Sequence, residues 1–187
     1  MEQEIINKIN QQINNFRLPR YNQLPVIELY IDQVVKIIET TLEPLRSNKE
    51  QVWITTSMIN NYTKQGLIKR PIKKRYDREQ VAYLIYICLT KSVMQISNIK
   101  ELIRSQKEKY ESEIAYDFFC TKLENSLQKV FTQTEPQPVE VSEHTEQIFL
   151  LEATVDTIAQ QIYLNKYLEI LSQRNKAATK TTAEKQN

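Results

Sequence analysis

The chain of 187 residues contains a single glycine, Gly66. Phosphate-binding loops of the P-loop and Rossmann types need several glycines, because backbone N–H groups must approach the phosphate closely. Tight β-turns also use glycine at positions with positive φ. A single glycine therefore excludes those nucleotide sites and predicts an all-α fold of long helices.

The residues that most often carry catalysis or metal binding are also scarce. The chain has one histidine, His144, in a stretch rich in Pro and Glu, and two cysteines, Cys88 and Cys120. A Ser-His-Asp arrangement would need the histidine held in a cleft, and a zinc site would need more His and Cys ligands. The cysteines lie far apart on apolar helical patterns, which is typical of reduced core thiols. We expect no enzyme activity, no metal and no cofactor.

The composition is that of an ordinary globular protein, with 41% hydrophobic and 26% charged residues. No apolar run approaches the roughly 18–20 residues that span a bilayer. The N-terminal residues are polar and lack the apolar stretch of a signal peptide. These features predict a cytoplasmic protein with no membrane partner.

Prolines and apolar periodicity divide the N-terminal half. Residues 1–24 are expected to be an N-terminal arm, either a short amphipathic helix or a frayed segment. Pro25 suits the entry of a helix predicted over Val26–Leu45, which Pro44 and a polar run end.

A compact unit follows. Thr55, Thr56 and Ser57 are candidate N-caps of a short helix up to Gln65, and Gly66 stands where a left-handed residue would close it. Met58, Ile59 and Tyr62 are expected on its buried side. The next segment, Lys69–Asp77, is too charged for a core helix and predicts a turn or a small β-wing. Glu79–Val93 is nearly all apolar and predicts a helix buried on most sides.

The C-terminal region, 104–174, is also expected to be helical. One or two helices cover Asn98–Phe131, residues 132–146 form a linker with two prolines, and a last helix covers Gln147–Arg174. Residues 175–187 lack apolar periodicity and are expected to be disordered. The apolar stripe Ile148–Ile162 favours either packing on the chain's own helices or a homodimer seam, and the stripe then shifts to Leu164, Leu168 and Leu171.

Charge is segregated along the chain. Residues 60–80 carry seven basic and two acidic side chains, whereas residues 101–174 carry seven basic and thirteen acidic ones. A basic run is often only a solvated surface. Here it flanks a short capped helix, and a helix beside a basic wing is what groove insertion and phosphate neutralisation require together.

Two asparagines, Asn60 and Asn61, lie in the middle of the short helix. Asparagine is a mediocre helix former, but its amide can pair in bidentate fashion with adenine in a major groove. The alternative is that both simply occupy exposed positions in an Asn- and Gln-rich chain. Ser57 and Lys64 share their side of the helix because steps of three and four residues keep to one face.

Three motifs in this region resemble the winged-helix signature of the MerR family. They are INNYTKQGLI at Ile59–Ile68, with Tyr62, Gly66, Leu67, Ile68 and the following Pro71 matching directly, KRYDREQV at Lys74–Val81, and SNIKELI at Ser97–Ile103. The family usually has Arg and Tyr where this chain has Asn60 and Asn61. More closely, the segment from about Leu18 to Leu127 looks like the family called domain of unknown function 1836.

The resemblance implies a winged helix-turn-helix domain over residues 25–103, and a sequence-specific regulator that binds double-stranded DNA. The short helix would lie in the major groove and the basic wing on phosphates, and the C-terminal helices would offer a homodimer surface. The alternative is a protein–protein adaptor that reuses the fold. The predicted DNA-binding residues are Ser57, Asn60, Asn61, Lys64, Lys69, Arg70, Lys73, Lys74 and Arg75.

Overall fold

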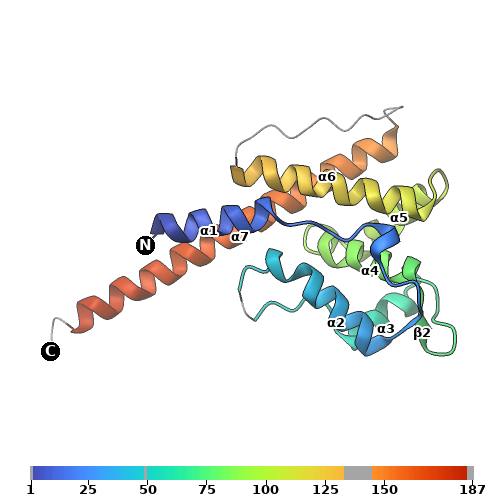
Figure 1. Ribbon diagram of the computed structural model, residues 1–187, viewed down its shortest axis with the longest axis horizontal. Coiled ribbons are helices and arrows are strands. Elements are labelled where there is room, and N and C mark those ends of the chain that lie inside the picture. The colour runs from blue at the N-terminus through green and yellow to red at the C-terminus, as the bar shows by residue number, and fades with distance from the viewer. Residues whose placement is uncertain (1, 49, 133–144, 185–187) are drawn as a thin grey trace.

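The computed structural model describes residues 2–48, 50–132 and 145–184, and these are mostly helical (Figure 1). The prediction of an all-α fold is confirmed at that level. The helices are α1 (Glu2–Asn14), α2 (Ile31–Leu42), α3 (Thr56–Lys64), α4 (Arg78–Thr90), α5 (Ile96–Lys107), α6 (Ser112–Thr132) and α7 (Glu146–Glu184). Short 3-10 turns cover Tyr21–Gln23 and Glu43–Leu45, and strands β1 (Leu29–Tyr30) and β2 (Arg75–Tyr76) pair antiparallel.

The helix predicted from Val26 begins later, at Ile31. Leu29 and Tyr30 are extended because they pair with Tyr76 and Arg75 of β2. Val26 and Ile27 consequently lie outside the helix and are 82% and 73% exposed. The helix ends at Leu42, three residues before the predicted Leu45, and a 3-10 turn that contains Pro44 covers the remaining residues.

The N-terminal arm, for which the sequence allowed either a short amphipathic helix or a frayed segment, forms helix α1. Helix α1 packs on α6, and Ile13 and Phe16 are buried there. The segment after it is held on α6 by Glu124, whose carboxylate accepts hydrogen bonds from both terminal nitrogens of Arg20 at 2.7 and 2.8 Å and from the backbone N–H of Leu18 at 2.8 Å. Residues 2–24 are therefore part of the helical body.

Helix α4 is the centre of the molecule and is surrounded by α2, α6 and α7 (Figure 1). Nearly every residue from Gln80 to Thr90 is buried, as its apolar sequence predicted. Cys88 of α4 and Cys120 of α6 are buried thiols without a disulfide, and burial raises the pKa of each to about 12. The prediction of reduced core cysteines is confirmed.

The last two helices pack side by side and run parallel. Lys122 pairs with Glu152 at 2.5 Å, the Ser126 hydroxyl donates to Asp156 at 2.5 Å, and the ring of Phe131 contacts Tyr163. The stripe predicted on the last helix is buried by the chain itself, with the side chains of Ile148, Leu151, Val155, Ile158 and Ile162 in the core.

The last helix also differs in length from the prediction. It continues to Glu184, where a disordered tail had been expected from residue 175. Residues 175–184 contain no glycine or proline, and Ala, Lys and Glu propagate a helix once it has formed. Most of the predicted linker, His144, and residues 185–187 lie outside the described residues.

One hydrophobic cluster joins the predicted DNA-binding domain to the C-terminal helices. It includes Leu42 and Ile59 from the first and Phe119, Leu127 and Val155 from the second. Among the described helices, none is long and apolar enough to cross a membrane.

Candidate nucleic-acid interface

The short helix α3 begins and ends as its sequence predicted. The Thr55 hydroxyl accepts a hydrogen bond from the backbone N–H of Met58 at 3.2 Å, which satisfies one of the open donors at the helix start. Ile59 and Tyr62 are buried, and burial raises the pKa of Tyr62 to about 12. The prediction that Tyr62 belongs to the core is confirmed.

Gly66 closes α3 in the left-handed conformation, with φ 71°. The N–H of Leu67 donates to the carbonyl of Tyr62 at 3.0 Å and that of Gly66 to Thr63 at 3.1 Å, the two bonds of a Schellman motif. Lys100 of α5 donates to the carbonyl of Gln65 at 2.9 Å, so a positive charge lies at the negative end of the helix. The helix is thus fixed at both ends, and its outer face is presented rigidly.

The four predicted residues of α3 are all exposed: Ser57, Asn60, Asn61 and Lys64. They lie opposite the buried pair Ile59 and Tyr62. The amide oxygen of Asn61 accepts a hydrogen bond from Gln65 Nε2 at 3.2 Å, so Asn61 would exchange that bond for any contact with a ligand.

The predicted wing is a short β-hairpin with a two-residue turn. Ile72 and Arg75 exchange both backbone hydrogen bonds, at 3.2 and 2.9 Å, around Lys73 and Lys74. Both lysines have positive φ, 49° and 63°, which a type I′ turn requires and which glycine or asparagine usually supplies. Two exposed lysines therefore occupy the tip of the turn despite an unfavourable backbone conformation.

The start of α4 holds the base of this hairpin. The buried side chain of Gln80 accepts from the N–H of Asp77 and donates to the carbonyl of Lys69, at 2.8 and 2.9 Å. The Asp77 carboxylate in turn accepts from the N–H of Gln80 at 2.8 Å, which completes a capping box. One glutamine therefore joins the first and last residues of the hairpin segment to the core helix.

Arg75 is held on the sheet by Tyr30. Its guanidinium donates to the Tyr30 hydroxyl at 3.1 Å and lies 5.0 Å from the centre of the ring. Since Tyr30 comes directly before α2, this contact connects the hairpin to α2 as well as to α4. Arg75 is exposed but less adaptable than the lysines at the tip.

Lys69 forms an ion pair within the chain, which makes it less available for the predicted contact with DNA. Its ammonium lies 2.7 Å from Glu79, and this hydrogen bond raises the pKa of Lys69. Burial alone would raise the pKa of Glu79, but hydrogen bonds from Lys69 and Ser112 hold it below its ordinary value. All nine predicted residues are exposed, and one of them, Lys69, is paired with an acid.

The family comparison matches residues 19–119 to the domain of unknown function DUF1836, which is more than half of the chain. The protein belongs to the DUF1836 family. No curated protein and no solved structure matches the chain. The DUF1836 region contains α2, α3, the hairpin, α4 and α5 and ends within α6, so the whole candidate interface lies inside it.

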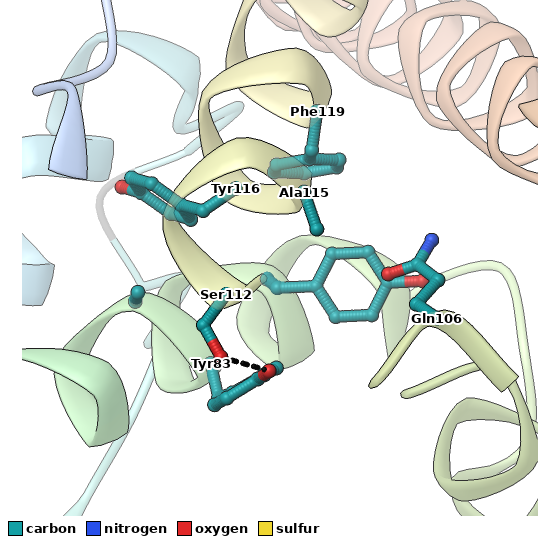
Figure 2. Close-up of a pocket in the computed structure, with 8 residues that line it drawn as sticks. Tyr83, Gln106, Ser112, Ala115, Tyr116 and Phe119 are labelled. Atoms are coloured by element: carbon teal, nitrogen blue, oxygen red, sulfur yellow. Dashed lines mark hydrogen bonds between the residues drawn. The ribbon is translucent and has the colours of Figure 1, made fainter. Parts of the chain in front are cut away.

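A small cavity lies within the same DUF1836 region, between α4, α5 and the start of α6 (Figure 2). Figure 2 shows the hydroxyls of Tyr83 and Ser112 joined by a hydrogen bond, which is 2.9 Å long. Ser112 also donates to Glu79 at 2.7 Å, so the base of the hairpin is connected to α6. The volume of about 20 Å³ has room for one water molecule and for no organic ligand.

The sequence analysis did not identify three residues that position the candidate interface: Tyr30, Gln80 and Lys100. Gln80 follows Asp77 at the spacing of a capping box, so it was detectable in the sequence. Tyr30 and Lys100 act across long sequence separations, and no local pattern identifies them.

Proposed function

We propose that this DUF1836 protein is a sequence-specific DNA-binding regulator with a winged helix-turn-helix module. One observation carries the proposal: a rigidly capped helix presents Ser57, Asn60, Asn61 and Lys64 next to a hairpin whose tip is Lys73–Lys74 (Figure 1). Helix α2 would support α3, which would enter the major groove as the recognition helix.

The hairpin and α3 would contact different parts of the DNA. Lysines and arginines of the hairpin neutralise phosphates without regard to sequence, whereas asparagine amides on α3 pair with base edges. Asn60→Ala or Asn61→Ala should relax base preference at a cost of ~1–3 kcal/mol. With Lys69 paired to Glu79, the four cations Arg70, Lys73, Lys74 and Arg75 imply a slope of log affinity against log salt of roughly −3.6, from about −0.9 per contact.

The test is selection of bound duplexes from a random DNA library at near-physiological salt. The wild type is compared with a Lys73→Ala/Lys74→Ala/Arg75→Ala variant, and with an Arg104→Ala/Lys109→Ala control that removes exposed charge outside the hairpin. We expect one enriched motif for the wild type and the control, and none for the hairpin variant. Recovery of DNA without enrichment, or no recovery at all, contradicts the proposal.

The second candidate is a protein–protein adaptor, and exposed apolar side chains beside the hairpin favour it. Val26, Ile27 and Ile72 are 82%, 73% and 69% exposed. Such groups are typical of protein-binding surfaces when they cluster. Absence of DNA enrichment, together with capture of an acidic protein that Ile72→Ser weakens, would favour the adaptor.

A further inference from the structure

Glu79, in the first turn of α4, binds polar groups from three other parts of the chain. Its Oε2 lies 2.7 Å from the ammonium of Lys69, at the base of the hairpin. Its Oε1 accepts a hydrogen bond from the Ser112 hydroxyl at 2.7 Å and lies 3.8 Å from Nζ of Lys107. Both carboxylate oxygens are therefore in use, and one of them holds a residue that the sequence predicted to contact DNA.

The partners of Glu79 on α5 and α6 fix it to the helical body. Nζ of Lys107 lies 4.1 Å from the centre of the Tyr83 ring, and the Tyr83 hydroxyl shares a hydrogen bond with Ser112 (Figure 2). Burial raises the pKa of Glu79, but the hydrogen bonds from Lys69 and Ser112 outweigh this effect and lower it. The carboxylate is thus charged at neutral pH and held in place at 21% exposure, whereas the side chain of Lys69 is 67% exposed.

The backbone of Lys69 is fixed at the edge of the candidate interface. Its carbonyl accepts a hydrogen bond from the buried Gln80 at 2.9 Å, and its neighbour Arg70 is exposed. Lys69 lies in the chain between the end of α3 and the turn of the hairpin. A carboxylate oxygen and a phosphate oxygen are both anionic acceptors for an ammonium group, so Glu79 and a DNA phosphate beside the hairpin would compete for Lys69.

We propose that Glu79 is autoinhibitory: it binds Lys69 in place of a DNA phosphate and lowers the affinity of the protein for every duplex. This inference rests on the proposed DNA binding. Phosphate contacts give affinity without regard to sequence, and non-specific sites far outnumber the specific site in a genome. Withholding one cation therefore reduces retention on non-specific DNA, and the base contacts of α3 contribute a larger part of the binding free energy.

Titration of the full chain with DNA at several salt concentrations tests the inference. Glu79→Gln removes the charge that holds Lys69, and its amide oxygen can still accept from Ser112, so circular dichroism should be unchanged. Lys69 then gains one phosphate contact. We expect the slope of log affinity against log salt to change from roughly −3.6 to roughly −4.5. Affinity should rise roughly fivefold at ~0.15 M salt, for the selected motif and for an unrelated duplex alike.

Two matched variants show whether the gain acts through Lys69. Lys69→Met/Glu79→Gln has the net charge of the wild type but no Lys69 ammonium to release, and it should bind DNA as the wild type does. Glu28→Gln removes an exposed carboxylate next to β1 without releasing Lys69, so it should leave the slope nearly unchanged. A gain from Glu28→Gln as large as that from Glu79→Gln, or a gain that survives in the double variant, would show general charge repulsion and overturn the proposal.

Amine acylation followed by mass spectrometry measures the release of Lys69 without DNA. The hydrogen bond to Glu79 raises the pKa of Lys69, so in the wild type it should be acylated more slowly than the exposed Lys73 and Lys74. In Glu79→Gln it should react about as fast as they do. Equal rates for the three lysines in the wild type would mean that Glu79 does not hold Lys69, and would overturn the proposal.

The two measurements together separate this inference from the proposed function. If Glu79→Gln releases Lys69 and the wild type binds DNA, but the variant binds no more tightly, the autoinhibition is wrong and DNA binding stands. If Lys69 is released and neither protein binds any duplex, the proposed function fails and the inference fails with it.

Discussion

At the residue scale, the tip of the hairpin combines two positive charges with an unfavourable backbone conformation. Lys73 and Lys74 both have positive φ, where an ordinary side chain costs about 1–2 kcal/mol. Asparagine and glycine accept this conformation more readily, and Asn-Gly is the preferred pair in a type I′ turn. A chain selected for stability alone would not place two lysines here, which is consistent with a role in binding.

The first prediction follows from that conflict. Lys73→Asn/Lys74→Gly should raise the free energy of unfolding by ~1–2 kcal/mol, because it relieves the backbone strain. The same change should lower DNA affinity and make the salt slope shallower by roughly 1.8, because two phosphate contacts are lost. Chemical denaturation and salt-dependent DNA titration measure the two effects.

The control is Lys73→Ala/Lys74→Ala. It removes the same charges but keeps side chains at positive φ, so it should weaken DNA binding without any gain in stability. Equal stability of the two variants would show that the turn is not strained.

A second prediction concerns Lys166, which lies buried on α7 and donates to the carbonyl of Arg46 at 2.9 Å. Burial lowers its pKa to about 8 from an ordinary 10.5, although the nearby Glu43 opposes the change. Between these two values the unfolded chain binds a proton that the folded chain has lost, so stability rises with pH. The destabilising effect of the buried charge is complete below pH 8 and is relieved above it.

Urea denaturation of the wild type and Lys166→Met at pH ~7 and ~9 measures this effect. We expect the wild type to gain stability relative to Lys166→Met as the pH rises, since the variant lacks the titrating group. Every other titrating side chain is common to both proteins and cancels in the comparison. Parallel pH profiles would mean that Lys166 is not desolvated in solution.

At the scale of elements, the presentation of α3 depends on its C-terminal turn. Gly66 at φ 71° makes the two bonds of the Schellman motif, and a Cβ added there would lie 3.5 Å from Lys100 Nζ, an ordinary contact. The cost of a side chain is therefore in the backbone and not in crowding. Gly66→Ala should destabilise the protein by ~1–2 kcal/mol, which lowers Tm by roughly 2–8 °C.

Calorimetry checks this third prediction, with Ser97→Ala on the exposed surface of α5 as a control that should leave Tm nearly unchanged. Because α3 would lose its fixed end, the variant should also bind its selected DNA more weakly at a temperature where it remains folded. An unchanged Tm would mean that a side chain at position 66 adopts this backbone conformation without cost.

Which elements the sequence could predict depends on how local their causes are. The caps of α3, the left-handed Gly66 and the buried α4 follow from neighbouring residues, and all were predicted correctly. Strand β1 was missed because only its pairing with β2, more than forty residues away, makes Leu29 and Tyr30 extended. The parallel packing of α6 and α7 also depends on tertiary contacts. For the candidate site, the exposed residues were predictable, whereas the ion pair that diverts Lys69 depends on Glu79, ten residues further on.

At the scale of the whole molecule, the interface and the C-terminal helices share one core. Helix α4 supports the hairpin through Gln80. It also packs on α6, where the ring centres of Tyr86 and Phe119 lie 4.9 Å apart. The segment 25–103, expected from the sequence as a domain, includes α4 but none of the α6 and α7 side chains that cover it. Such a fragment would expose a large apolar surface to water.

The last prediction is that this segment does not fold alone and that damage to α6 reaches the interface. In the full chain, Phe119→Ala should cost about 3–5 kcal/mol. Because one core makes unfolding cooperative, amide protection measured by hydrogen exchange should fall together in α3, α4 and α6. The exposed change Phe149→Ala, which removes a ring outside the core, serves as the control for loss of the same side chain. A fragment 25–103 with native-like helical circular dichroism, or protection of α3 that survives Phe119→Ala, would instead mean that the interface is an independent unit. Under the cooperative outcome, anything that stabilises the packing of α7 on α6 also stabilises the presentation of α3, since both are parts of one folding unit.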